Sequence, residues 1–373
     1  MIDNELQTRR RFLCNGLLVT AGAAITMHAP SAFSQISRPN RVGKNLMPLP
    51  MRSIKFMKMM NIKYPIIQAP TGSTVTPELT IAVAEKGALA ALPLTWTSPE
   101  DAVSQVTSIN KATDGAFFAN FVLQFTPKSL DSALQAGIKI VQFSWGLPSP
   151  EMIAKVRAAA VIMGIQVTNE ASARAAIDAG ADYLVCQGVE AGGHVQASRP
   201  LAESLKRVLS VAGDLPVVAS GGIATGEDMF NYIEMGAAAV VMGTRFVASQ
   251  ESAAHADYKA SLVKAKSEDT VFTVCFNRGW SNAPHRVLRN NTFENWESAG
   301  CPRLENSPGV NDIIGHFANG REAARYSYSL PIKGMTGQVS DAPMYAGKGV
   351  EYIDDIPTVA EIIDRIWHEY VVI

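Results

Sequence analysis

A histidine on a glycine-rich loop is the residue of this sequence best suited to acid–base chemistry. It ends the segment Gln187-Gly-Val-Glu-Ala-Gly-Gly-His194, which follows an apolar run. An imidazole accepts a proton near neutral pH, and glycines let a loop pass close to a ligand. The remaining histidines have no adjacent glycine cluster. We therefore predict that His194 is a catalytic base, with a purely structural histidine as the alternative.

Two further glycine-containing loops have the composition of a phosphate site. Ser220-Gly-Gly222 and Met242-Gly-Thr244 each follow a separate apolar run. Backbone N–H groups approach an anion closely at glycine, and a hydroxyl adds a donor. The chain has neither a GxGxxG fingerprint nor a Walker A sequence, so a mononucleotide such as FMN fits better than a dinucleotide. The predicted phosphate-binding residues are Ser220, Gly221, Gly222, Met242, Gly243 and Thr244.

Amide side chains and open backbone after other apolar runs supply donors and acceptors for a flat heterocycle. The simpler interpretation of each amide alone is that it satisfies loop backbone. No HxH, HExxH or paired-carboxylate spacing is present, so we predict no metal site, and the GxSxG elbow of serine hydrolases is absent. The remaining predicted cofactor-binding residues are Gln68, Ala69, Pro70, Thr71, Asn120, Gln187, Gly192 and Gly193.

Eight short apolar runs separated by helical stretches would bring these loops together. The runs are continuous rather than alternating, as in strands buried on both faces of a parallel sheet. This rhythm predicts an α/β fold, a (β/α)8 barrel, with an open doubly wound sheet as the alternative. In a barrel the loops that follow the strands share one catalytic face. The runs cover residues 65–69, 88–92, 116–122, 138–143, 165–168, 182–187, 216–220 and 238–242.

The stretch after the eighth run breaks this rhythm and is rich in aromatic residues, Trp280 and Trp296 among them. We predict that residues 251–335 form a helical cap, because covering a reactive site excludes water. The barrel then comprises residues 62–250 and 336–373.

The N-terminus has the features of an export signal. Arg9 and Arg10 precede an apolar run at 17–27, which is shorter than the about 20 residues that span a bilayer. We predict a twin-arginine type signal over residues 1–34, a periplasmic location, no stable membrane anchor, and a mobile lead-in at 35–61 that wraps the surface. The balance of 33 basic and 34 acidic residues argues against nucleic-acid binding.

The histidine and glycine blocks together resemble the nitronate monooxygenase family, formerly called 2-nitropropane dioxygenases. The resemblance spans residues 62–365 and includes Tyr345-Ala-Gly-Lys-Gly349. It implies a TIM barrel that binds FMN and oxidises small alkyl nitronates, or nitroalkanes, with O2 to a carbonyl compound and nitrite. His194 would be the general base.

Two features of the resemblance leave alternatives open. NADH-dependent FMN reductases of enoyl thioesters or quinones share the barrel and a similar histidine loop. The family usually has glycine two residues after the histidine, where this chain has Gln196, so loop shape and substrate fit are not carried over. A ligand-binding barrel without catalysis is a third alternative.

Overall fold

Eight parallel strands form a closed barrel. The computed structural model describes residues 48–373, so the predicted signal at 1–34 and much of the lead-in lie outside the described residues. The strand order is β1-β9-β8-β6-β5-β4-β3-β2, and the ring closes where the Leu89 amide donates to the Ile66 carbonyl (3.0 Å). The predicted barrel is therefore confirmed. Its strands are β1 (Ile66–Gln68), β2 (Ala90–Pro93), β3 (Phe117–Val122), β4 (Ile140–Ser144), β5 (Ile162–Val167), β6 (Tyr183–Gln187), β8 (Val217–Ser220) and β9 (Ala239–Met242).

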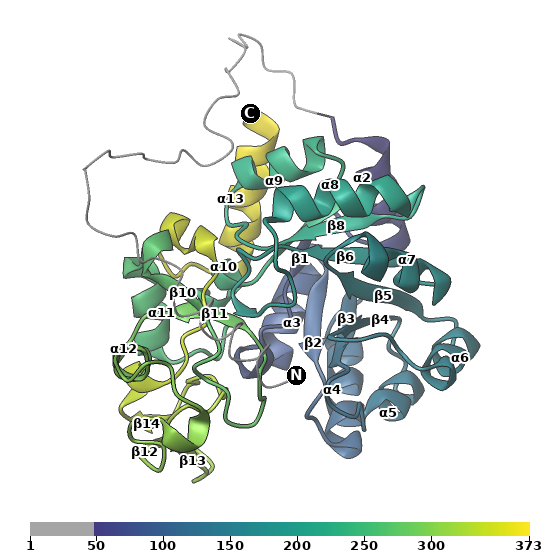
Figure 1. Cartoon of the computed structure of the whole chain (residues 1–373). Helices are drawn as coiled ribbons and strands as arrows, with labels where there is room; N and C mark the ends of the chain where they lie inside the picture. The colour runs from purple at the N-terminus through teal and green to yellow at the C-terminus, as the bar shows by residue number, and fades with distance from the viewer. Residues whose placement is uncertain (1–47) are drawn as a thin grey trace.

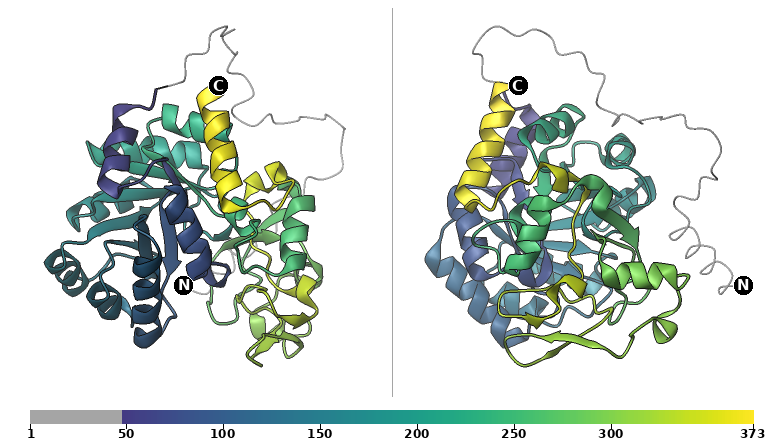
Figure 2. Two further views of the ribbon diagram at one scale, coloured as in Figure 1. Left: turned by 180° about the vertical axis from the view of Figure 1, so that it is seen from behind. Right: turned by 90° about the vertical axis from the view of Figure 1, so that its left-hand side faces the viewer.

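Helices cover the outside of the barrel. The side chains of Thr76 and Ser149 cap helices that begin with proline, a residue favoured in the first turn. The C-terminal helix α13 (Val359–Val372) packs against α9 and α3 and completes the ring (Figure 2). The other outer helices are α3 (Pro77–Lys86), α4 (Pro99–Ala112), α5 (Leu130–Gln135), α6 (Pro150–Ala158), α7 (Glu170–Asp178), α8 (Leu201–Ala212), α9 (Gly226–Glu234) and the short α10 (Thr244–Val247).

Part of the expected lead-in is a core element. Residues 51–60 form helix α2 (Met51–Met60), whose Phe56 and Met60 are 0% and 1% exposed. They join a cluster of strand residues that includes Tyr183, whose ring centroid lies 5.8 Å from that of Phe56. The expectation that this stretch wraps the surface is therefore wrong for α2. Figures 1 and 2 show α2 and the green-to-yellow cap at opposite ends of the barrel.

The segment between α10 and α13 is a mixed cap rather than the helical one predicted. Beside its helices it contains a three-stranded sheet ordered β13-β12-β14, and its strands β10 and β11 form a second sheet, ordered β10-β11-β7, with β7 (Gly193–His194) from the loop after β6. Some of the strand partners are distant in sequence, so the local pattern does not reveal them. The cap also extends past residue 335, because β14 pairs with β12. Its elements are α11 (Ala256–Lys264), β10 (Thr270–Thr273), β11 (His285–Leu288), α12 (Asn291–Ser298), β12 (Ile313–His316), β13 (Glu322–Ala324) and β14 (Thr336–Gly337).

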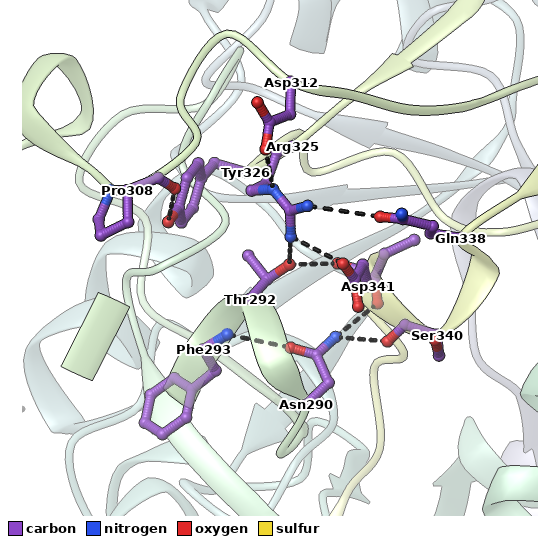
Figure 3. Close-up of polar contacts among 11 residues, drawn as sticks. Asn290, Thr292, Phe293, Pro308, Asp312, Arg325, Tyr326, Gln338, Ser340 and Asp341 are labelled. Atoms are coloured by element: carbon purple, nitrogen blue, oxygen red, sulfur yellow. Dashed lines mark hydrogen bonds and ion pairs between the residues drawn. The ribbon is translucent and has the colours of Figure 1, made fainter. Parts of the chain in front are cut away.

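A guanidinium at the centre of the cap joins several of these elements (Figure 3). Arg325 donates to the Asp341 carboxylate (2.8 Å) and to the Thr292 hydroxyl (3.0 Å). Its Nε also donates to Asp312 (3.2 Å). The side chains of Arg325 and Asp341 are only 13% and 10% exposed, so this ion pair is largely shielded from water. The network fixes α12 and the end of β13 to the chain that returns toward the barrel.

Candidate active site

A cavity of about 370 Å³ lies at the carboxyl ends of the barrel strands, beneath the cap. This volume falls within the range of small-molecule sites. Loops after the strands supply most of its lining, and the cap contributes aromatic side chains. The structure brings together here the predicted residues Ala69, Pro70, Thr71, Asn120, Gln187, Gly192, Gly193, His194, Ser220, Gly221, Gly222, Gly243 and Thr244.

Gln68 and Met242, both predicted to bind a cofactor, do not line the cavity. The Gln68 side chain is buried, donates to its neighbour's carbonyl at Ala69, and accepts a hydrogen bond from the Ala91 amide (2.9 Å). Met242 is also buried, and its carbonyl accepts from the Ala69 amide (2.9 Å). Both residues therefore support the barrel wall where it closes, which corrects their predicted role.

His194 is held by the barrel and the cap together. It lies in β7 (Gly193–His194), which pairs with β11 of the cap so that His194 stands opposite His285. Its ring stacks on Trp280, with centroids 3.9 Å apart and planes at 18°. The ring of Tyr345 lies 5.4 Å away. Aromatic groups therefore surround the imidazole on more than one side.

This surrounding sets the protonation state of His194. Burial, with a smaller contribution from His285, lowers the pKa of His194 well below its usual value of 6.5. Its buried Nε2 has no hydrogen-bond partner among the described residues. In the Nδ1–H tautomer, this nitrogen carries a free lone pair at neutral pH. The imidazole is therefore in the form that accepts a proton.

His285 lies behind His194 and is completely buried. Its Nδ1 lies 3.0 Å from the Ala283 carbonyl, and its Nε2 accepts a hydrogen bond from the Phe276 amide (3.3 Å). These two contacts fit a neutral ring with the proton on Nδ1. Burial lowers the pKa of His285 to about 4. His285 is thus a structural partner of the base and carries no charge at neutral pH.

A strap formed by residues 345–349 crosses the glycine loops. The Gly347 amide donates to the Thr244 hydroxyl (3.0 Å), which leaves the hydroxyl hydrogen of Thr244 free to be donated. A Cβ at Gly192 would collide with the strap backbone at Gly347, so the loop and the strap approach this closely only with glycine. Lys348, on the same strap, has an exposed side chain outside the cavity lining.

Amide groups missed by sequence reasoning also reach the site. Gln142 and Gln166 line the cavity beside Asn120. The Gln142 Nε2 donates to Asn120 Oδ1 (3.3 Å), and Gln166 Nε2 donates to Gln196 Oε1 (2.6 Å). The available signal was a polar residue inside each predicted apolar run, at 138–143 and 165–168. Such a residue in a buried strand requires a polar partner.

Gln196, two residues after His194, connects the histidine loop to the barrel. Its side-chain Oε1 accepts a hydrogen bond from the Trp145 backbone N–H (3.0 Å), and its backbone N–H donates to Gln187 Oε1 (2.8 Å). Gln187 Nε2 in turn donates to the His194 carbonyl (3.3 Å). Trp145 has a left-handed backbone (φ 58°), which is uncommon for a non-glycine residue. Gln196 thus holds both the base loop and a strained tryptophan.

Comparison with known proteins agrees with this architecture. A capped (β/α)8 barrel with its site at the strand carboxyl ends belongs to the class of barrel enzymes. The family described as nitronate monooxygenase matches residues 53–133 and 124–369. A nitronate monooxygenase of Pseudomonas aeruginosa is 30% identical over 362 residues, covering 84% of this chain and 98% of that protein. The chain therefore belongs to the nitronate monooxygenase family and is an oxidoreductase.

Two other relatives have different names. A Rhodococcus jostii protein named (3aS,4S,5R,7aS)-5-hydroxy-7a-methyl-1-oxo-octahydro-1H-indene-4-carboxyl-CoA dehydrogenase is 28% identical over 351 residues, covering 83% of this chain and 93% of that protein. A variant of FabK from Thermotoga maritima is similar in structure, with a TM-score of 0.70 and 27% identity, covering 85% of this chain and 95% of that one. Proteins that share between 27% and 30% of their residues with this chain therefore carry different names.

Proposed function

We propose that this protein is an FMN-dependent enzyme that oxidises nitronates, and nitroalkanes whose α-proton His194 removes, with O2 to a carbonyl compound and nitrite. The observation that carries the proposal is the neutral, half-buried imidazole of His194: the residue lines the cavity, and its Nε2 has no hydrogen-bond partner among the described residues. Membership of the nitronate monooxygenase family supports the same chemistry.

The cavity lining fits a flavin mononucleotide. Gly221 and Gly222 both have positive φ angles, 130° and 70°, and a Cβ at Gly222 would lie 2.9 Å from Glu190 Cβ. Glycine therefore fits at Gly222 where another residue would collide and be strained, and backbone N–H groups in such glycine turns can bind an anion. These loops and Thr244 would hold the phosphate, and the amides near Asn120 would hold the ring. The bound flavin supplies the site that takes electrons from the substrate and passes them to oxygen.

The residues of the chain orient the substrate and move its proton. For a neutral nitroalkane, the His194 imidazole removes the proton on the carbon that bears the nitro group. A preformed nitronate has already lost that proton and requires no base. Trp280, stacked on the imidazole, limits the access of water and keeps the ring in its neutral form. A positioned base of this kind accelerates proton transfer by about 10²–10⁴-fold.

Replacement of the base tests the assignment. The His194→Asn variant should lose about 10²–10⁴-fold in kcat/KM on nitroethane and change less than about threefold on ethylnitronate. His316→Asn is the matched control, because His316 is an exposed histidine at the end of β12 and does not line the cavity. An equal loss on both substrates would show that His194 does not act as the base.

A reductase activity is the second candidate, and the Rhodococcus and Thermotoga relatives at 28% and 27% identity favour it. The two candidates differ in the electron donor. Under anaerobic conditions the purified protein is mixed separately with propionate 3-nitronate and with NADH, and the flavin absorbance is followed. Bleaching with the nitronate alone supports the oxidase chemistry. Bleaching with NADH alone would replace it with the reductase.

We also propose that the chain is exported through the twin-arginine route, on the basis of Arg9 and Arg10 ahead of a short apolar run. These residues lie outside the part that the structure describes. Within residues 48–373, no helix combines the length and the apolar character needed to cross a bilayer. Replacing both arginines with lysine should leave precursor in the cytoplasm, and unchanged periplasmic recovery would disprove the proposal.

A further inference from the structure

Four aromatic side chains form a wall along one side of the cavity. This aromatic wall consists of Trp96, Trp145, Trp280 and Tyr328, all of which line the cavity. Trp96 follows β2 and Trp145 follows β4, whereas the other two come from the cap. Two loops of the barrel and two positions of the cap therefore each place an aromatic side chain at the same side of the cavity. The proposed chemistry at His194 does not by itself require such a set.

The aromatic wall is continuous. Trp280 stands at its centre, with its ring centroid 4.9 Å from that of Trp145 and 6.4 Å from those of Trp96 and Tyr328. Trp96 and Tyr328 lie 5.9 Å apart. These separations are those of contacting aromatic pairs. Because Trp280 also stacks on His194, the wall runs from the base outward to the cavity mouth.

The outer end of the wall has aromatic surface that no protein group covers. Trp96 is 48% exposed although it lines the cavity, whereas Trp280 is only 6% exposed. Phe125 packs behind both of them, with its ring centroid 5.1 Å from each. The backing ring holds Trp96 in place, so its exposed surface is presented on a fixed support. A planar ring bound on that surface would remove it from water.

The inner end of the aromatic wall has an unfavourable backbone conformation. Trp145 adopts a left-handed backbone with φ of 58°, a conformation that is unfavourable for a residue with a Cβ. The Gln196 side chain accepts the hydrogen bond of the Trp145 backbone N–H and so holds this conformation. Strain of this kind concentrates at ligand sites.

The charge of the cavity lining indicates the charge of the ligand. Arg321 is the one residue with a permanently charged side chain in the described lining, and no carboxylate contributes to it. The Arg321 guanidinium lies over the Phe317 ring, 4.0 Å from its centroid, and its Nη1 is 3.5 Å from the Ser329 hydroxyl. Arg321 is also close enough to Tyr328 to lower the pKa of that phenol, against a larger rise from burial. A cation beside the aromatic wall favours an anion with an apolar body.

From these observations we infer that the substrate is an aryl nitronate, an anion whose planar aromatic ring lies on the exposed part of the aromatic wall. The inference rests on the proposed function and narrows its substrate class, because a short alkyl nitronate would leave Trp96 uncovered. Two aryl nitronates and one O2 give two aryl aldehydes and two nitrites. Each C–N bond breaks, each carbon is oxidised by two electrons, and O2 is reduced by four as one of its oxygen atoms enters each aldehyde.

The test compares two nitronates on the purified holoenzyme. Phenylnitromethane anion and ethylnitronate are assayed for nitrite release, and kcat/KM is measured for each. We expect the aryl substrate to be favoured by about tenfold or more, since stacking and the burial of a ring each contribute. The Trp96→Leu variant should lose most of this preference, and Trp96→Phe should keep part of it. Tyr352→Leu is the control, because Tyr352 is 56% exposed and does not line the cavity.

A second readout does not depend on turnover. Phenylacetate places a carboxylate where the aryl nitronate has its nitro group, and propionate is the alkyl equivalent. Phenylacetate should quench the tryptophan fluorescence of the wild-type holoenzyme at about tenfold lower concentration than propionate, and Trp96→Leu should abolish the difference.

The outcomes separate the two levels of the proposal. Equal kcat/KM for the aryl and alkyl nitronates, or an aryl preference unchanged in Trp96→Leu, would overturn the substrate inference and leave nitronate oxidation standing. Turnover of neither nitronate would overturn the proposed function and the inference with it.

Discussion

The buried histidine behind the base predicts how the stability of the protein depends on pH. His285 has a pKa of about 4 in the folded protein against an ordinary value of 6.5, because burial disfavours its charged form. The unfolded chain therefore binds a proton at a higher pH than the folded protein does. The free energy of unfolding should be fully retained above about pH 6.5 and fall as the pH drops toward 4, where the folded protein also takes up the proton.

The size of the effect follows from the shift. A difference of about 2.5 pKa units corresponds to about 3 kcal/mol once both states are protonated, and about 2 kcal/mol of this is already lost between about pH 7 and about pH 5. Protonation of the folded ring is also opposed because its Nε2 would lose the hydrogen bond that it accepts from the Phe276 amide. His194 adds a loss of the same sign, because its pKa is lowered as well.

Urea unfolding of the purified protein, followed by tryptophan fluorescence at the two pH values, measures this loss. The His285→Gln variant keeps a polar, neutral side chain and should be less stable at both pH values. Its loss between them should be smaller than that of the wild type by about 2 kcal/mol. His316→Gln, at an exposed position, should leave the wild-type loss unchanged. A His285→Gln variant with the full wild-type pH dependence would refute the account of His285 as a buried neutral ring.

Two further predictions concern the cap and the base loop. Arg325→Gln removes one partner of a shielded pair with Asp341 and should lower the free energy of unfolding by about 3 kcal/mol, whereas Arg289→Gln, in a pair about 40% exposed, should cost less than about 1 kcal/mol. Similar losses in thermal or urea unfolding would show that burial does not separate the two pairs. Gln196→Ala should cost about 2 kcal/mol and change the fluorescence of Trp145, because two side-chain hydrogen bonds are lost. A loss below about 0.5 kcal/mol would show that the Gln196 side chain does not hold the loop.

The barrel was predictable because each of its units carries its own signal. A buried strand, a capped helix start and a glycine stop recur along the chain, and a parallel strand in such a unit needs no partner other than its neighbours. The same rule located most of the cavity lining, since residues after the strands meet at one face. Gln68 is an exception to this rule, because its side chain accepts a hydrogen bond from the Ala91 amide of the neighbouring strand where the barrel closes.

The cap and the environment of the base were not predictable in the same way. β7 is two residues long, and it is a strand only because β11, some ninety residues later in the chain, pairs with it. The stacking of Trp280 on His194 depends on the same long-range pairing. Among the aromatic residues of the cap, sequence alone does not separate Trp280, which lines the cavity, from Trp296, which packs in the core of the cap itself. Such distinctions arise from tertiary contacts rather than local pattern.

The pairing of β7 with β11 has a consequence for engineering by exchange of modules. In many barrels the loops can be treated as interchangeable parts on a constant scaffold. Here His194, the expected base, lies in a loop of the barrel, but its backbone pairs with strand β11 of the cap. A chimera that took the cap from a relative to alter specificity would also replace the strand that aligns the imidazole. Selectivity and acid–base geometry are therefore inherited together, and a graft that preserves activity must carry His285 and its neighbours with it.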